Sequence, residues 1–168
     1  GTIIYDPVLQ QPAIDSPTIN IGTRIINEEV TFDTSVGNSG EINFNTDIRI
    51  TSAGSLTVLG GVKLNMDKNL LVEGELKLLG DFNSPIIITN RTQQDWGIIT
   101  FTSSSIASSI SPTNDYSSGS IIINSQIENG GVGGSILINT TKTLYIENVN
   151  ITQESIKAIA STATLCMK

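Results

Sequence analysis

Acidic side chains are the groups of this 168-residue chain best suited to chemistry, because the chain contains no histidine. Carboxylates can hold a metal ion, or act in pairs as acid and base. Five aspartates recur at intervals of roughly 14 to 20 residues: Asp33, Asp47, Asp67, Asp81 and Asp95. A carboxylate ladder for Ca²⁺ is conceivable, but neither an EF-hand loop nor a G-G-x-G-x-D repeat is present. We therefore expect solvated aspartates in turns, with no metal site and no cofactor.

The triplet Asn45-Thr46-Asp47 matches an N-T-D motif of polygalacturonases, which hydrolyse glycosidic bonds. The other motifs of those enzymes, an Asp-Asp pair, G-H-G and R-I-K, are absent. Glycoside hydrolysis usually needs two carboxylates at a defined separation, and the sequence does not place Asp47 and Asp67 together. The lack of histidine also removes Ser-His and Cys-His catalysis. We expect the triplet to form a turn, and we expect no catalytic residues and no enzyme activity.

Three N-x-Ser/Thr sequons are candidate glycosylation sites if the protein is exported, with acceptors at Asn90, Asn139 and Asn150. Asn90 is the best of the three, because it lies between an apolar run and the polar run 91–95. The single cysteine, Cys166, cannot form an internal disulfide, so we expect a small packed residue there.

The overall charge argues against some partners. Formal net charge is -7 and the sequence pI is about 4.4, with nine basic residues scattered along the chain. Phosphate binding needs clustered lysines and arginines, so we expect no nucleic-acid partner. No apolar run approaches the ~20 residues of a membrane-spanning helix. The chain starts at Gly1 without a visible signal peptide, so we expect a mature product or part of a larger parent protein.

Short runs of alternating apolar and polar residues dominate the chain from Ile25 onward, and Gly or Asn turns separate them. Such alternation predicts strands with one buried face. The runs are 30–32, 42–44, 48–50, 56–58, 62–66, 70–72, 76–78 and 86–88. Glycines at 60, 61, 74 and 80 are expected at bends, where glycine tolerates positive φ. Only residues 154–160 show a hint of helical period.

The first 22 residues differ from the rest, because Pro7, Pro12 and Pro17 disfavour helix. We expect an extended N-terminal arm or cap over 1–22, followed by one domain over 23–168. The arm carries five residues that we expect in strands able to pair with the same chain or a neighbour: Ile3, Ile4, Tyr5, Ile19 and Ile21.

An internal repeat of about 23 residues appears in the second half of the chain. Residues 120–124 recur as 143–147, 98–99 as 121–122, and Ile136 as Ile159, while Ile127 recurs after 24 residues as Ile151. A fixed period of this size indicates a repeat architecture in which each unit buries its inner face against the next. About five rungs fit between residue 41 and the end. We expect stacked Asn124 and Asn148 to form a ladder, and residues 103–120 to leave the rung as a longer loop.

Several segments resemble the β-helices of bacterial and archaeal surface proteins. They are 56–64 (LTVLGGVKL), 70–80 (LLVEGELKLLG), 84–89 (SPIIIT), 95–101 (DWGIITF) and 125–132 (SQIENGGV). The resemblance covers residues 41 to 160 and departs by one missing Gly after Trp96-Gly97. It implies an all-β fold, a right-handed single-stranded parallel β-helix of roughly five rungs. We expect Trp96 to pack on the core.

The fold hosts many activities, so function is a separate question. The resemblance favours an extracellular, cell-surface structural or adhesive solenoid, which associates with itself or with other cell-surface proteins and possesses open rung edges. End-to-end stacking or strand addition by the arm would then build a filament. The alternative is a polysaccharide-binding or polysaccharide-cleaving β-helix, for which Trp96, Tyr116 and Tyr145 are the obvious stacking groups.

Overall fold

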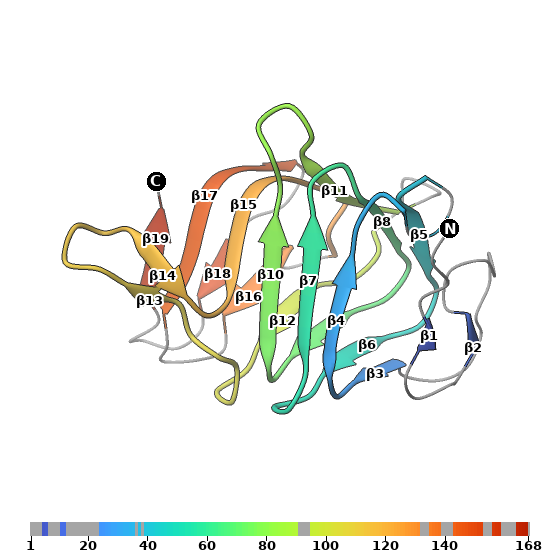
Figure 1. The fold of residues 1–168 in the computed structure, drawn as a ribbon, viewed down its shortest axis with the longest axis horizontal. Helices are drawn as coiled ribbons and strands as arrows, with labels where there is room; N and C mark the ends of the chain where they lie inside the picture. Colours follow the sequence, from blue (N-terminus) through green and yellow to red (C-terminus); the bar gives the residue numbers. More distant parts are fainter. Residues whose placement is uncertain are drawn as a thin grey trace.

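The chain folds as a right-handed parallel β-solenoid, in which the backbone winds into a stack of coils. In Figure 1, β4, β7 and β10 run upward at the front, and after each one the chain returns behind them and advances by one coil. This computed structural model describes residues 5–6, 11–12, 24–35, 37, 39–90, 95–131, 135–138, 143–152, 156–158 and 164–167. Only the backbone is described for 5–6, 11–12, 157–158 and 164–167. No helix able to cross a membrane occurs in this part.

Each full coil contributes a strand segment to each of three parallel faces. Face 1 contains β3 (Arg24–Ile26), β6 (Ile48–Ile50), β9 (Leu70–Val72), β12 (Ile99–Phe101), β16 (Ile136–Ile138) and β18 (Ile156–Ala158). Face 2 contains β4 (Glu29–Phe32), β7 (Ser55–Leu59), β10 (Glu75–Leu79), the first halves of β15 (Ile121–Glu128) and β17 (Thr143–Thr152), and β19 (Thr164–Met167). Face 3 contains β5 (Glu41–Phe44), β8 (Lys63–Met66), β11 (Ile86–Thr89) and the second halves of β15 and β17.

The described strands thus form five complete coils and part of a sixth, which confirms the all-β solenoid of about five rungs. Two short antiparallel pairs lie outside the three faces. They are β1 (Tyr5–Asp6) with β2 (Gln11–Pro12), and β13 (Ser109–Ile110) with β14 (Tyr116–Ser118). The first solenoid strand begins at Arg24. The proposed division into an arm over 1–22 and a domain over 23–168 stays a prediction, because most of the arm lies outside the described residues.

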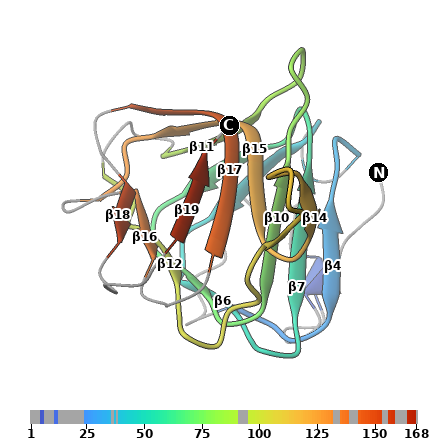
Figure 2. The same ribbon diagram turned by 90° about the vertical axis from the view of Figure 1, so that its left-hand side faces the viewer.

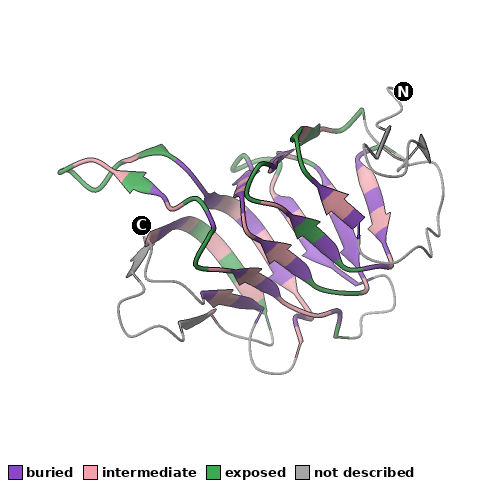
Figure 3. Cartoon of the chain, turned by 90° about the horizontal axis from the view of Figure 1, so that it is seen from below, coloured by how far each residue is buried: buried purple, intermediate pink, exposed green. Residues whose placement is uncertain are grey.

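The core is a set of aliphatic columns, one residue per coil, between the three faces. One column on face 3 consists of Ile42, Leu64, Ile88 and Ile127, and each of them is at most 2% exposed. Along the strands, buried and more exposed residues alternate, as Figure 3 shows by colour. Because the cross-section is narrow, small aliphatic side chains fill it without many aromatics. The eight alternating runs of the sequence all coincide with strands.

The register between coils corrects the fixed 23-residue period. Ile121 pairs with Tyr145, a shift of 24, and Ile136 pairs with Ile156, a shift of 20, so Ile159 is not its partner. Ile99 lies on face 1 and Ile121 on face 2, so these two do not repeat each other. Residues 156–158 are a strand rather than part of a helix. The shift of 24 between Ile127 and Ile151 is confirmed.

Two asparagines turn the chain from face 2 to face 3 within single long strands. Asn124 in β15 and Asn148 in β17 have φ of 44° and 49°. Asparagine tolerates this left-handed conformation better than other non-glycine residues. Asn148 Nδ2 donates to Asn124 Oδ1 at 2.6 Å, and Asn124 Nδ2 donates to the carbonyl of Gly80 at 3.0 Å. The predicted asparagine ladder is therefore confirmed, and it continues onto the backbone of the preceding coil.

Substitutions at Asn124 separate the two contributions of this corner. We expect Asn124→Ala to lower the free energy of unfolding by about 2–3 kcal/mol, from left-handed strain and the lost hydrogen bond. Asn124→Gly keeps the backbone conformation accessible, so its loss should be smaller by about 1 kcal/mol or more. Urea unfolding followed by circular dichroism measures both. Equal losses for the two variants would contradict the backbone role of this residue.

Candidate functional site

A hairpin leaves the fourth coil between Ser108 and Ser120, as the sequence predicted for its serine-rich loop. The two serines close the gap: Ser108 Oγ donates to the carbonyl of Ser120. Leu76 N of the preceding coil donates to Ser120 Oγ at 3.2 Å, and Tyr145 N of the following coil donates to Ser108 Oγ at 2.7 Å. Both serines are buried. Their hydroxyls thus satisfy strand donors on both sides of the insertion.

The hairpin rests on the outer surface of face 2. The rings of Tyr116 and Tyr145 lie 5.8 Å apart, and Tyr145 is 2% exposed although it points outward. Burial raises the pKa of the Tyr116 phenol above its ordinary value, against an opposing effect of Lys77. Trp96 is also buried, and its Nε1 donates to the carbonyl of Glu128 at 2.7 Å. Packing of Trp96 on the core is confirmed, and neither Trp96 nor Tyr145 can stack on a ligand.

The C-terminal end of the core is open among the described residues. Val149 and Ile151 continue two inward columns of face 3, yet both are only partly buried, as is Ile156. In the preceding coil, Ser125 and Ile127 occupy the same columns and are fully buried. Strand β19 pairs with the first half of β17 only. Figure 2 looks onto this end, where β17 and β19 lie nearest the viewer.

The N-terminal end is closed by contrast. Phe32 and Phe44 of the first coil are buried, with ring centroids 6.0 Å apart. Arg24 is buried as well, and its guanidinium carbon lies 5.3 Å from the centre of the Phe44 ring. A cation over an aromatic face is attracted by the ring quadrupole. The two ends of the solenoid therefore differ in how completely they cover the core.

The acidic residues lie at separate turns. Asp47 accepts hydrogen bonds from Asn69 N at 3.0 Å and Asn69 Nδ2 at 3.1 Å, which links two coils. The triplet at 45–47 is accordingly a turn between β5 and β6. Asp33 and Asp81 each accept from backbone in their own turns, and the bonds from Ser35 lower the pKa of Asp33. Among the described residues no three His, Cys, Asp or Glu side chains gather as a metal site would need.

The three sequons fall in different environments. Asn90 is 7% exposed, and its Nδ2 donates to the Met66 carbonyl and to Asp67 Oδ1, both at 2.9 Å. A glycan is attached to this nitrogen, so glycosylation would break both bonds in the folded chain. This geometry disfavours Asn90, which the sequence ranked first. Asn150 is exposed on the outer surface of β17, whereas Asn139 lies outside the described residues.

The predicted assembly arm is described only in part. Tyr5 lies in β1, whose backbone pairs with Pro12 of β2 rather than with a solenoid strand. Ile3, Ile4, Ile19 and Ile21 lie outside the described residues. Strand addition by this segment therefore stays a prediction, as does the packing of Cys166, whose side chain is not described.

Two hollows mark the outer surface. The larger, of about 480 Å³, lies over face 1 and is lined by Asp47, Ile48, Arg49, Asn69, Leu71, Ile98 and Thr100. An ion pair of 2.9 Å between Arg49 and Glu73 lies beside it. The smaller, of about 130 Å³, lies at the corner of faces 2 and 3, lined by Asp81, Phe82, Pro85, Asn124, Ser125, Gln126, Asn148 and Asn150.

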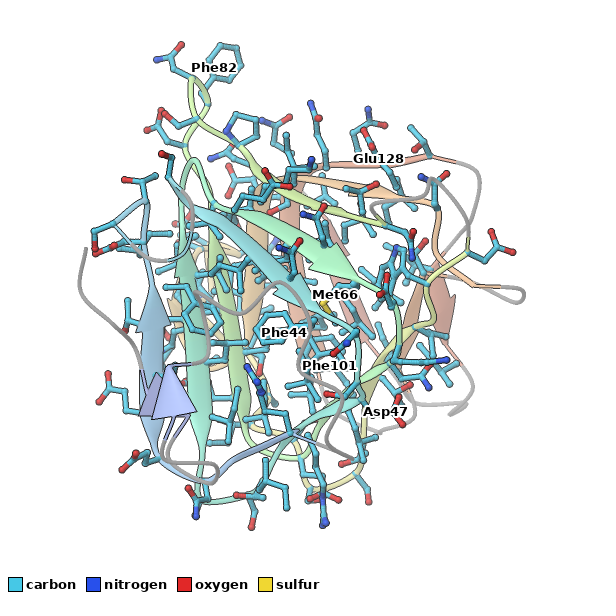
Figure 4. All side chains as sticks on the ribbon, turned by 90° about the vertical axis from the view of Figure 1, so that its right-hand side faces the viewer. Phe44, Asp47, Met66, Phe82, Phe101 and Glu128 are labelled. Atoms are coloured by element: carbon cyan, nitrogen blue, oxygen red, sulfur yellow. The ribbon has the colours of Figure 1, made fainter. Side chains whose placement is uncertain are left out.

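Phe82 is the residue of the smaller hollow that sequence reasoning missed. It is 81% exposed at the tip of the turn between β10 and β11. Figure 4 shows it projecting from the solenoid, while Phe44, Met66 and Phe101 point inward. A signal was present in the sequence, since Phe82 is the one large aromatic inside the turn-forming run 80–85 (GDFNSP).

Comparison with known proteins identifies no relative: the chain matches no protein-family model, and no curated protein or solved structure is significantly similar to it.

Proposed function

We propose that this chain is a structural and adhesive module of an extracellular surface protein, and that it associates with a second copy through its C-terminal coil. The proposal includes no catalytic step. The observation that carries it is the open end of the core, where Val149 and Ile151 are half-exposed in columns that are otherwise buried. Covering these apolar groups with a further strand would remove them from water, which favours association.

The backbone at the same end supports the proposal. Residues 149–152 of β17 pair with β15 on one side and with no described strand on the other. An unpaired edge presents N–H and C=O groups that another strand can bind. The β13–β14 hairpin also extends past the last described coil, along the stacking direction (Figures 1 and 3). It would flank whatever strand is added there.

A second copy is the occupant that fits this end. A strand with alternating aliphatic residues would continue the columns, and every described solenoid strand of this chain has that pattern. Two modes of contact remain distinct. In one, the coil ends stack directly; in the other, residues 1–22 of the neighbour add a strand to the edge of β17. A head-to-tail contact of this kind does not close, so it produces filaments.

Charge at position 151 tests the proposal. Light scattering coupled to size exclusion should show a molar mass that rises with concentration for the intact chain. Ile151→Lys should abolish the rise, because the new ammonium group would be buried in the contact. Thr152→Lys adds the same charge on the outer side of the same strand and should leave the rise unchanged. A chain beginning at Thr23 distinguishes the two modes, since only strand addition by the arm requires residues 1–22.

The intact chain remaining monomeric throughout the concentration series would overturn the proposal. So would equal association of the Ile151→Lys and Thr152→Lys variants, because the contact would then lie elsewhere. Circular dichroism of both variants confirms that they are folded before their masses are compared.

A further inference from the structure

The corner hollow joins an exposed aromatic ring to a row of uncharged amides. The turn that carries Phe82 is fixed: Asp81 and Ser84 bridge their backbones, and Asn83 N donates to Asp81 Oδ1 at 2.9 Å. Phe82 is therefore held in solvent by an ordered turn. Exposing so much apolar surface has no benefit for folding, and such surfaces commonly mark binding sites.

The amides beside the ring have unused hydrogen-bonding groups. Gln126 and Asn150 are register neighbours on the outer surface of face 3. Within the part of the chain that the structure describes, neither side chain has a hydrogen-bond partner. Asn148 uses its Nδ2 in the ladder and leaves its Oδ1 toward solvent. The hollow thus offers both amide donors and carbonyl acceptors.

The lining selects a chemical class of ligand. It contains no lysine or arginine, and its only charged residue is Asp81, so an anionic ligand is disfavoured. An apolar ring beside paired donors and acceptors suits a molecule with an apolar face and a rim of hydroxyls. A sugar ring has this structure: its axial C–H groups pack on an aromatic face and its hydroxyls both donate and accept.

We propose that this hollow binds one residue of a neutral glycan, with the sugar packed on Phe82 and hydrogen-bonded by Gln126, Asn148 and Asn150. This site is independent of the association proposed for the coil end. The sugar can come from two sources with the same chemistry: a glycan of another molecule, or a glycan attached to Asn150 of this chain.

Binding is tested with neutral oligosaccharides as probes. Isothermal titration of the intact chain, produced without N-glycosylation, uses tetramers of N-acetylglucosamine, glucose and mannose, with tetragalacturonate as the anionic comparison. At least one neutral tetramer should bind better than the anionic one. Phe82→Ala should weaken that binding by about tenfold or more, the effect of losing an aromatic stacking partner.

Ile106→Ala is the matched control, because Ile106 is another exposed apolar residue, 44% exposed, and it does not line the hollow. It should bind like the unchanged chain. Gln126→Ala should weaken binding independently of Phe82. Absence of binding by every neutral tetramer overturns the proposal, and so does equal binding by the Phe82→Ala variant.

A second arm distinguishes the two sources. Protein from a glycosylating host is analysed by mass spectrometry for a glycan at Asn150. If the glycan is present and only Thr152→Ala, which removes the sequon and leaves the lining intact, binds free tetramer, the hollow holds the chain's own sugar. If no glycan is attached and the unchanged protein binds tetramer, the sugar belongs to another molecule. A glycosylated protein that binds free tetramer as well as Thr152→Ala does excludes the chain's own sugar from the hollow.

Discussion

Replacing Trp96 with alanine is expected to lower the free energy of unfolding by about 3–5 kcal/mol, as for other buried large aromatic residues. The side chain is 2% exposed and belongs to the main core cluster, so its removal leaves a cavity. It also leaves the carbonyl of Glu128 without the indole donor. Total stabilities of small domains are about 5–15 kcal/mol, so much of the stability would be lost. Chemical denaturation followed by circular dichroism measures the change.

Two further variants identify the cause of that loss. Trp96→Phe keeps most of the ring volume and removes the donor, so it should cost about 1–3 kcal/mol. Phe82→Ala also removes a large aromatic side chain, but one that is 81% exposed, and should change stability by less than about 0.5 kcal/mol. If Trp96→Ala and Phe82→Ala were equally stable, the placement of Trp96 in the core would be wrong.

Gly74→Ala is the second substitution with a large expected effect, about 3 kcal/mol or more, because a methyl group has no room. A Cβ at position 74 would lie 2.1 Å from the Gly54 carbonyl oxygen and 2.2 Å from that of Thr51. Both contacts are backbone atoms of the preceding coil, so neither can move without disturbing the stack. Thermal unfolding of the purified variant measures the loss, and failure to express as a folded protein is its extreme form.

Gly61→Ala is the comparison for Gly74→Ala. Gly61 has φ of 84°, and a Cβ there would meet only a side-chain methyl of Thr34 at 3.0 Å. Its cost should be the left-handed strain alone, about 1–2 kcal/mol. A larger loss for Gly61→Ala than for Gly74→Ala would contradict the close stacking of coils at this corner.

The strands were predictable because their signal is local. A strand with one face in a core alternates apolar and polar residues, and shifting it by one residue would reverse the two faces. The runs at 42–44, 56–58 and 76–78 therefore identified strands and inward residues directly. The asparagine ladder was predictable for a similar reason, since Asn124 and Asn148 combine a turn preference with the coil spacing.

The stacking register was less accessible because it depends on loop lengths. The shift between paired strands varies from 20 residues for β16 and β18 to 44 for β10 and β15. The 44-residue step contains the hairpin inserted between Ser108 and Ser120, and no fixed period describes it. Glycine at 74 was correctly placed at a bend, but the reason is close backbone approach rather than positive φ.

The candidate sites were the least predictable part. Asn90 sits in a polar sequence context, yet the fold buries it against Met66 and Asp67, which are 24 and 23 residues away. The corner hollow combines Phe82 of the third coil with Gln126 and Asn150 of the fourth and fifth. These residues come together only through stacking, so their proximity requires the register that the sequence did not supply.

Electron microscopy of the purified intact chain tests most directly the claim that the open C-terminal coil mediates association. Adjacent coils lie about 4.8 Å apart, so five coils span about 24 Å, and the account predicts particles that lengthen along the solenoid axis by roughly this step per added molecule. Ile151→Lys protein should give single particles under the same conditions. Single particles of the intact chain at every concentration would contradict the account.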